Sequence, residues 1–236
     1  MPIPTDKFEK TVEFLHAFLT VNFENYFELQ NFIEKQIEKN QKELDIKYNE
    51  VSDIEDMAEW NIAMNKFDQE FGTDLFRFDH EFPNRTRYFM INQTHSMLEF
   101  YLKWFCQRLK SINKNPIGIS DLSGSSDLEK GKLYLKRIYQ VNFSRLEPEW
   151  SFLNNMRKIR NQIIHNNGIF EIKDTEILRI INLMPELSRS WEENNHELKE
   201  GEEYEIKINS KKLNEKYIEN VKVFFKKLVF EIKKNE

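Results

Sequence analysis

The chain has 236 residues and a formal net charge of −5, which argues against a generic nucleic-acid-binding protein, because such proteins are normally basic. Its 20 phenylalanines far outnumber its 6 glycines and 6 prolines, and 32% of its residues are charged. Few helix breakers and many aromatic residues predict an all-α protein, a bundle of long helices packed through aromatic side chains.

The same sequence favours a cytoplasmic protein without membrane contact. No apolar run approaches the roughly 18 residues that a bilayer-spanning helix needs, and the first residues lack the basic and apolar regions of a signal peptide. The single cysteine, Cys106, has no partner for an internal disulfide and fits a reducing cytosol. We expect Cys106 to be a buried apolar residue.

The first half of the chain is expected to form three helices. Apolar residues at helical spacing predict a helix over residues 6–49, in one piece or kinked near residues 22–25. Ser52, with Glu55 three residues later, matches a capping box and predicts a second helix over residues 52–71. A connector is expected over residues 76–83, and a third helix runs from Asn84 or Thr86 to about residue 112.

The second half begins with a loop over residues 113–126, which is rich in glycine and serine. Helices are then expected from Asp127, from Pro148 to about residue 166, over residues 174–194 and over residues 210–234. The alternating pattern of residues 203–209 predicts a short strand or hairpin arm. We interpret residues 1–236 as a single helical domain. Residues 1–75 form an N-terminal extension, residues 81–170 the core of the domain, and residues 171–236 its C-terminal helices.

The helix that begins at Pro148 carries the most informative residues. On a helical wheel its expected core face comprises Phe152, Met156, Ile159 and Ile163, with Leu153 on a flank. Arg160, Asn161 and His165 fall outside that face, so replacing Arg160 or His165 is expected to leave stability nearly unchanged. Twelve Lys/Arg and five Asp/Glu lie between Lys103 and Arg160, a local excess of seven positive charges that permits an anionic partner.

Arg160-Asn161-Gln-Ile-Ile-His165 resembles the R-x(4-6)-H motif of the HEPN superfamily, including the polar residue that often follows the arginine. The resemblance extends over roughly residues 81–170. It implies a helical bundle that pairs into a homodimer and places both motif helices in a shared cleft. Many such proteins are metal-independent endoribonucleases of toxin–antitoxin and antiphage systems, so the implied partners are RNA and an antitoxin or another defence protein.

The resemblance also implies roles for individual residues. His165 would be the acid/base group, Arg160 would neutralise the scissile phosphate, and Asn161 would orient the site. Cleavage through attack of a 2′-hydroxyl on the adjacent phosphate needs proton transfer and charge stabilisation, and no cofactor or metal is expected. From the wheel alone, Arg157 and Lys158 are candidate RNA contacts. Glu99, which lies among apolar residues of the preceding helix, is either a satisfied carboxylate at the edge of the core or a partner of the active-site arginine.

Three alternatives stay open. The spacing from Arg189 to His196 also fits the motif, but the intervening residues are acidic and would repel phosphate. The protein could be a non-catalytic module that binds RNA, a nucleotide or a partner protein, in the manner of an antitoxin or a sensor subunit. Finally, His165 could simply be a cation at the end of a capped helix, where it interacts favourably with the helix dipole.

Overall fold

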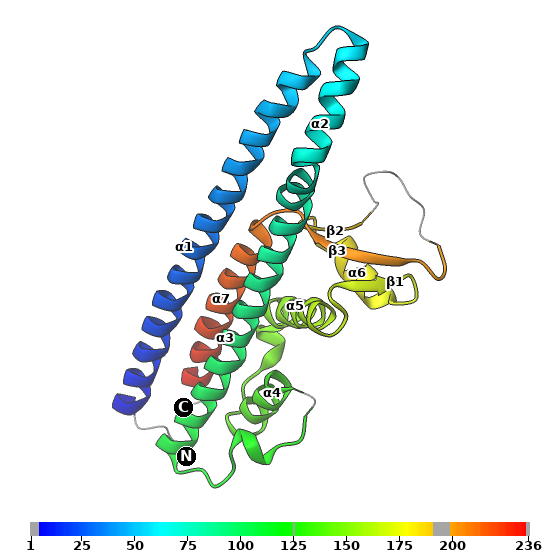
Figure 1. Ribbon diagram of the computed structural model, residues 1–236. Coiled ribbons are helices and arrows are strands. Elements are labelled where there is room, and N and C mark those ends of the chain that lie inside the picture. Colours follow the sequence, from blue (N-terminus) through cyan, green and yellow to red (C-terminus); the bar gives the residue numbers. More distant parts are fainter. Residues whose placement is uncertain (1–4, 125, 191–198, 235–236) are drawn as a thin grey trace.

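The computed structural model describes residues 5–124, 126–190 and 199–234, and it confirms the prediction of an all-α bundle with a short strand (Figure 1). The first three helices are α1 (Thr5–Ser52), α2 (Met57–Phe76) and α3 (Phe82–Asn113), and they are followed by α4 (Asp127–Ile138) and α5 (Glu147–Asn166). The remaining elements are β1 (Ile169–Glu171), α6 (Thr175–Leu183), β2 (Leu187–Arg189), β3 (Glu203–Ile208) and α7 (Lys212–Lys234).

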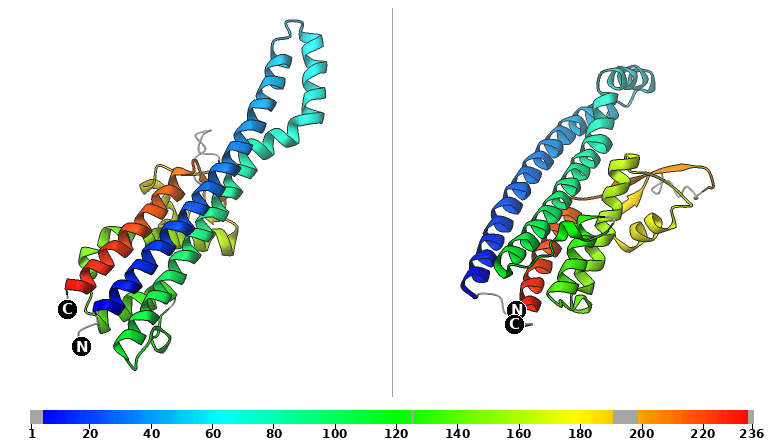
Figure 2. Two further views of the ribbon diagram at one scale, coloured as in Figure 1. Left: turned by 90° about the vertical axis from the view of Figure 1, so that its left-hand side faces the viewer. Right: turned by 90° about the horizontal axis from the view of Figure 1, so that it is seen from below.

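Helix α1 is one uninterrupted helix. Of the two expectations for this segment, a single helix or a helix kinked near residues 22–25, the first is confirmed. Asn22 stays helical because its side-chain amide donates to the Phe18 carbonyl one turn back, at 2.9 Å. The same amide donates to the Tyr101 hydroxyl of α3 at 2.8 Å, so it also ties the two helices together. Figure 2 shows the far half of α1 and α2 projecting as a helical hairpin beyond the rest of the molecule.

The predicted start of the second helix at Ser52 is wrong. Ser52 is the last residue of α1, and α2 begins at Met57. Asp56 caps α2 instead, because its carboxylate accepts hydrogen bonds from the backbone amides of Ala58 and Glu59, both at 2.9 Å. The sequence analysis chose Ser52 because of Glu55 three residues later, but α1 continues through Ser52 and leaves the cap to Asp56.

The predicted connector over residues 76–83 is also wrong, since a π-helical turn over Arg77–Glu81 joins α2 directly to α3. Pro83 lies in the first turn of α3, where its missing amide hydrogen is tolerated. The Phe78 carbonyl accepts a hydrogen bond from the side chain of Gln41 at 2.9 Å. The π-helical turn, stabilised by this hydrogen bond from α1, therefore joins α2 to α3 across Pro83 as a bend without a break in the helix.

The helix expected over residues 174–194 is shorter than predicted, and a strand of a small antiparallel sheet follows it. Helix α6 ends at Leu183, ahead of Pro185, and β2 follows at Leu187–Arg189; residues 191–194 lie outside the described part of the chain. The strand order is β1-β3-β2, with Phe170 opposite Tyr204 and Leu187 opposite Ile208. The alternating pattern that predicted a strand in β3 is confirmed, because alternate β3 side chains are buried.

One continuous core joins the helices and the sheet, and α7 contributes much of it. Helix α7 packs against α1, α3 and α5, and Figure 2 shows it running alongside α1 and α3. Cys106 is fully buried, as predicted. The largest fully buried side chains are Tyr134, Tyr204, Tyr217, Phe8, Phe23, Phe105, Phe170, Phe224 and Phe225. The first half of α1 therefore packs into the same core as the motif helix.

Candidate functional site

Helix α5 carries the motif, and both of its ends match the sequence expectation. Pro148 stands in the first turn, and α5 ends at Asn166 with Asn167 in the left-handed conformation (φ 54°). Gly168 follows with φ 81° and donates from its backbone amide to the Gln162 carbonyl at 3.0 Å. Asn and Gly adopt this conformation more readily than other residues, so the sequence fixes where the motif helix stops.

The buried face of α5 is wider than the wheel predicted. Leu153 is fully buried rather than on a flank, and Phe152 is only partly buried. Arg160 lies between Leu153 and Met156 around the helix, inside the buried arc. The cause is that α5 contacts both α3 and α7. The expectation that Arg160 stands clear of the core is therefore wrong, whereas His165 is exposed as expected.

The Arg160 guanidinium is held partly by its own neighbour in the motif. Its Nη1 donates to the Asn161 side-chain oxygen at 3.1 Å, which brings two of the three motif residues together. Its Nε is buried and has no hydrogen-bond partner within the described residues. Because this nitrogen is shielded from solvent, its N–H is not accessible to a phosphate oxygen in the single chain.

A cluster of titratable side chains from α3 and α7 lies beside Arg160. His95 is almost fully buried, and its Nδ1 is 2.6 Å from the Tyr217 hydroxyl of α7. On its other side, His95 Nε2 is 3.5 Å from a Glu99 carboxylate oxygen. The hydrogen bond with His95 lowers the pKa of Glu99, and the nearby charge of Arg160 lowers it further, against the opposing effect of burial. Burial raises the pKa of Tyr217 far above its usual value.

Glu99 therefore lies near enough to Arg160 to feel its charge, but the ion pair that the structure gives it is with His95. The structure adds His95 and Tyr217, which the sequence analysis did not connect with the site. His95 and Glu99 are four residues apart on a predicted helix, and that spacing could have indicated the pair. Nothing in the sequence linked Tyr217 to it, because α7 reaches α3 and α5 only through the tertiary fold.

His165 occupies the exposed end of α5 and is not joined to Arg160. Five residues separate them, so in a regular helix His165 lies about 140° around the axis and about 7.5 Å along it. Within the described residues no hydrogen bond or ion pair connects the two side chains. Asn166 and Asn167 beside it are also exposed. In a single chain, therefore, the His165 imidazole is accessible, the Arg160 guanidinium is partly buried, and the two groups are not in contact.

The two additional RNA-binding candidates are engaged with other groups of this chain. Arg157 donates to Asn154 at 3.1 Å and forms an ion pair with Glu129 at 3.5 Å. Lys158 forms an ion pair with Glu176 of α6 and lowers the pKa of that carboxyl group. These contacts neutralise part of the positive charge that the sequence places along α5.

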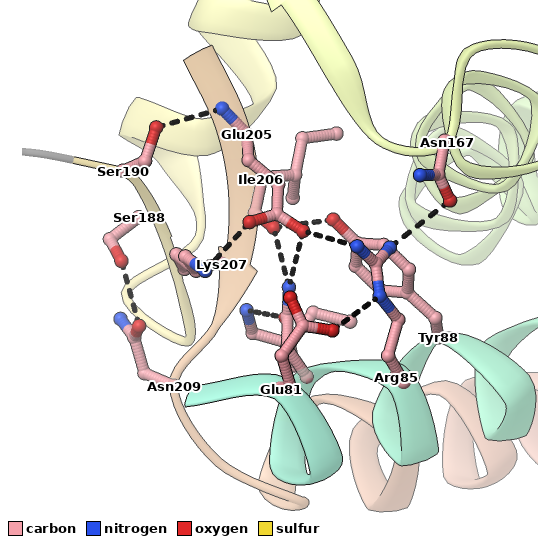
Figure 3. A network of polar contacts seen from close by, with 12 residues as sticks. Glu81, Arg85, Tyr88, Asn167, Ser188, Ser190, Glu205, Ile206, Lys207 and Asn209 are labelled. Atoms are coloured by element: carbon pink, nitrogen blue, oxygen red, sulfur yellow. Dashed lines mark hydrogen bonds and ion pairs between the residues drawn. The ribbon is translucent and has the colours of Figure 1, made fainter. Parts of the chain in front are cut away.

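The end of the motif helix is anchored to α3 and the sheet by a polar network (Figure 3). Arg85 donates to the Asn167 side chain at 3.1 Å and to Glu81 at 3.2 Å, and it forms an ion pair with Glu205 of β3 at 3.3 Å. The Tyr88 hydroxyl donates to the Ile206 carbonyl at 2.5 Å. The network holds the residues after His165 on rigid elements, which preorganises the end of the helix.

No protein-family model, curated protein or solved structure matches this chain. Within the described residues, none of the helices combines the length and apolar character needed to cross a bilayer. The remaining evidence on function is the geometry of the motif itself.

Proposed function

We propose that the protein is a metal-independent endoribonuclease of the HEPN type, of the kind found in antiphage and toxin–antitoxin systems. The observation that carries the proposal is the arrangement at the end of α5. Arg160 is hydrogen-bonded to Asn161, and His165 is exposed five positions further along the same helix. These are the groups that phosphodiester cleavage without a metal needs.

In the proposed reaction, His165 removes the proton from a ribose 2′-hydroxyl, and the 2′-oxygen attacks the adjacent phosphorus. The bond from phosphorus to the 5′-oxygen of the next nucleotide breaks, and that oxygen takes up a proton. Arg160 stabilises the negative charge that builds on the phosphate. The products are a 2′,3′-cyclic phosphate and a free 5′-hydroxyl. General acid–base catalysis contributes about 10²–10⁴-fold to such a reaction.

A second copy of the chain completes this site in the proposal. In one chain the helix holds the His165 imidazole and the Arg160 guanidinium apart. A two-fold pair of motif helices would bring two copies of each residue to one cleft, so that the histidine of one chain could act beside the arginine of the other. Glu99, with His95 behind it, would hold Arg160 in position. Neither of these two residues is proposed to touch RNA.

The proposal is tested by incubating the purified protein with total cellular RNA, with and without EDTA. We expect EDTA-resistant cleavage by the wild type and a loss of at least about 100-fold in His165→Ala. Asn166→Ala is the matched control, because Asn166 is the exposed neighbour of His165 in the same helical turn. Equal cleavage by wild type and His165→Ala would refute the assignment of His165.

Arg160 calls for a different variant, because it lies in the buried arc of α5. Arg160→Ala would remove packing together with charge, so Arg160→Lys, which keeps the charge but loses the planar fork, is the more informative change. We expect reduced cleavage with nearly unchanged RNA binding. Unchanged cleavage in Arg160→Lys would show that the fork is not needed.

The separation of His165 from Arg160 within one chain favours a second candidate function, a binding module that does not cut RNA. In such a module Arg157 and Lys158 contribute less to contacts with a phosphate backbone, because they already contact Glu129 and Glu176. This function predicts RNA or partner binding that weakens steeply with salt and yields no products. Gel-shift measurements at two salt concentrations, made beside the cleavage assay, distinguish the two functions.

A further inference from the structure

A row of exposed apolar side chains runs along one side of α1. Phe14, Phe18, Val21, Leu29 and Phe32 are each between 42% and 62% exposed. On a helical wheel they fall within an arc of about 80°. The spacing of Phe14, Phe18, Val21, Asn25 and Phe32 is four, three, four and seven residues. This is the spacing of the contact positions of a helix that pairs with another helix.

A second row lies on α3. Phe82, Phe89 and Phe100 are exposed, and their separations of seven and eleven residues place them within about 20° on the wheel. The two rows lie at the same height along the antiparallel helices. Asn22 hydrogen-bonds to Tyr101 and Glu34 pairs with Arg87, so residues 22–34 of α1 lie alongside residues 87–101 of α3.

Both rows face away from α7. Gln30 of α1 and Thr94 of α3 each hydrogen-bond to Asn214 of α7, so they mark the side of each helix that is turned toward the core. The exposed rows lie about 150° and about 130° from those residues. Figure 2 shows α7 on one side of the α1–α3 pair, so the rows share the opposite side. We call them together the phenylalanine face.

The phenylalanine face is as large as one side of a stable protein interface. With about 200 Å² for a fully exposed phenylalanine, its eight apolar side chains leave about 800 Å² uncovered. The largest apolar patch on a typical monomer is about 300–600 Å². A standard interface takes about 800 Å² from each partner, so two copies of this face would bury about 1,600 Å².

We propose that the phenylalanine face is the surface on which two copies of this chain associate. Between Phe14 and Phe32 none of the wheel positions in the α1 row is charged, so the row offers no ion pair that would select a charged partner. Asn25 is its one polar member and is exposed. A single asparagine at a contact position is a device by which self-pairing helices fix their register and number. The inference does not depend on whether the protein cuts RNA.

The test is the mass of the full chain in solution, measured by light scattering and sedimentation equilibrium over a range of concentrations. We expect a dimer for the wild type. Val21→Glu and Phe32→Glu should each raise the dissociation constant at least about 100-fold, because each places two buried charges in the dimer. Phe230→Glu is the matched control, since Phe230 is a 65% exposed phenylalanine of α7 outside this face. The control should remain dimeric.

Two outcomes would overturn the proposal: a wild-type monomer throughout the range, or a dimer that persists in both glutamate variants. Circular dichroism should show unchanged folding, because Val21 and Phe32 are exposed in the single chain. RNA cleavage by a folded, monomeric Phe32→Glu would contradict the shared catalytic cleft and leave the association surface standing. A dimeric wild type without ribonuclease activity would contradict only the proposed function.

Discussion

Replacing Gly168 with alanine should destabilise the protein much more than the same change at Gly201. Both glycines have similar positive φ values, 81° and 83°. A Cβ at Gly168 would lie 2.2 Å from the Tyr88 hydroxyl oxygen and under 3 Å from its ring, whereas a Cβ at Gly201 would meet nothing within 4 Å in the described part of the chain. Comparing the two alanine variants therefore separates the free-energy cost of the left-handed backbone from the cost of the contact with Tyr88.

The backbone cost is shared by both substitutions. A left-handed conformation costs an L-residue about 1–2 kcal/mol, and the reduced freedom of the unfolded chain offsets about 0.4–1 kcal/mol of it. Gly201→Ala should therefore lose about 1 kcal/mol. At Gly168 the Tyr88 hydroxyl must also move away from the Ile206 carbonyl. Overpacking and the broken buried hydrogen bond each cost about 1–3 kcal/mol, so together with the backbone cost the total is about 5 kcal/mol.

Thermal unfolding followed by circular dichroism measures the difference. For a chain of this size, 1 kcal/mol corresponds to about 2–4 °C in Tm, so Gly168→Ala should lower Tm by about 10–20 °C and Gly201→Ala by about 2–4 °C. Adding Tyr88→Phe to Gly168→Ala removes the nearest atom and should restore part of the loss. Equal losses in the two alanine variants would refute the argument from close approach.

Three further predictions concern charges and caps. Arg87→Met should cost about 3–5 kcal/mol in urea denaturation, because it leaves the buried carboxylate of Glu34, bound at 2.8 Å by two guanidinium nitrogens, without its partner. Asp56→Ala should cost about 1 kcal/mol, and Ser52→Ala should be close to neutral in the same assay; a larger loss at Ser52 would contradict the assignment of the cap. The pKa of Glu99 is lowered in the folded protein, so Glu99 contributes stability above its unfolded pKa of about 4.3 and loses it as the pH falls below that value. The difference in stability between wild type and Glu99→Gln should therefore shrink from about pH 5 to pH 3, and a difference independent of pH would contradict this sign.

Local signals in the sequence determined where several elements begin and end. Ser126 caps α4, Pro148 opens α5, and Asn167 with Gly168 closes it, because these residues act through their own backbone and nearest neighbours. The alternating pattern of β3 likewise predicted a strand. Each of these features depends on residues within one turn or one strand, so a single sequence can specify it.

The wrong predictions involve residues whose partners are distant in the chain. The segment over residues 76–83 looked like a connector, but Gln41 supports it as part of a bent helix. The segment after α6 looked helical, but β3 supplies a strand for it to pair with. Propensity is a weak signal where a distant contact supplies the hydrogen bonds.

The candidate site shows the same difference between features set by local sequence and features set by distant contacts. Arg160, Asn161 and His165 are predictable as the end of one helix, because their spacing and the cap after them are local. The packing of α3 and α7 around α5 depends on long-range contacts, which draw Arg160 into the buried arc and bring His95 and Tyr217 to Glu99. The helical period fixes which residues share a face, but the number of helices that pack against that face is set by the whole fold.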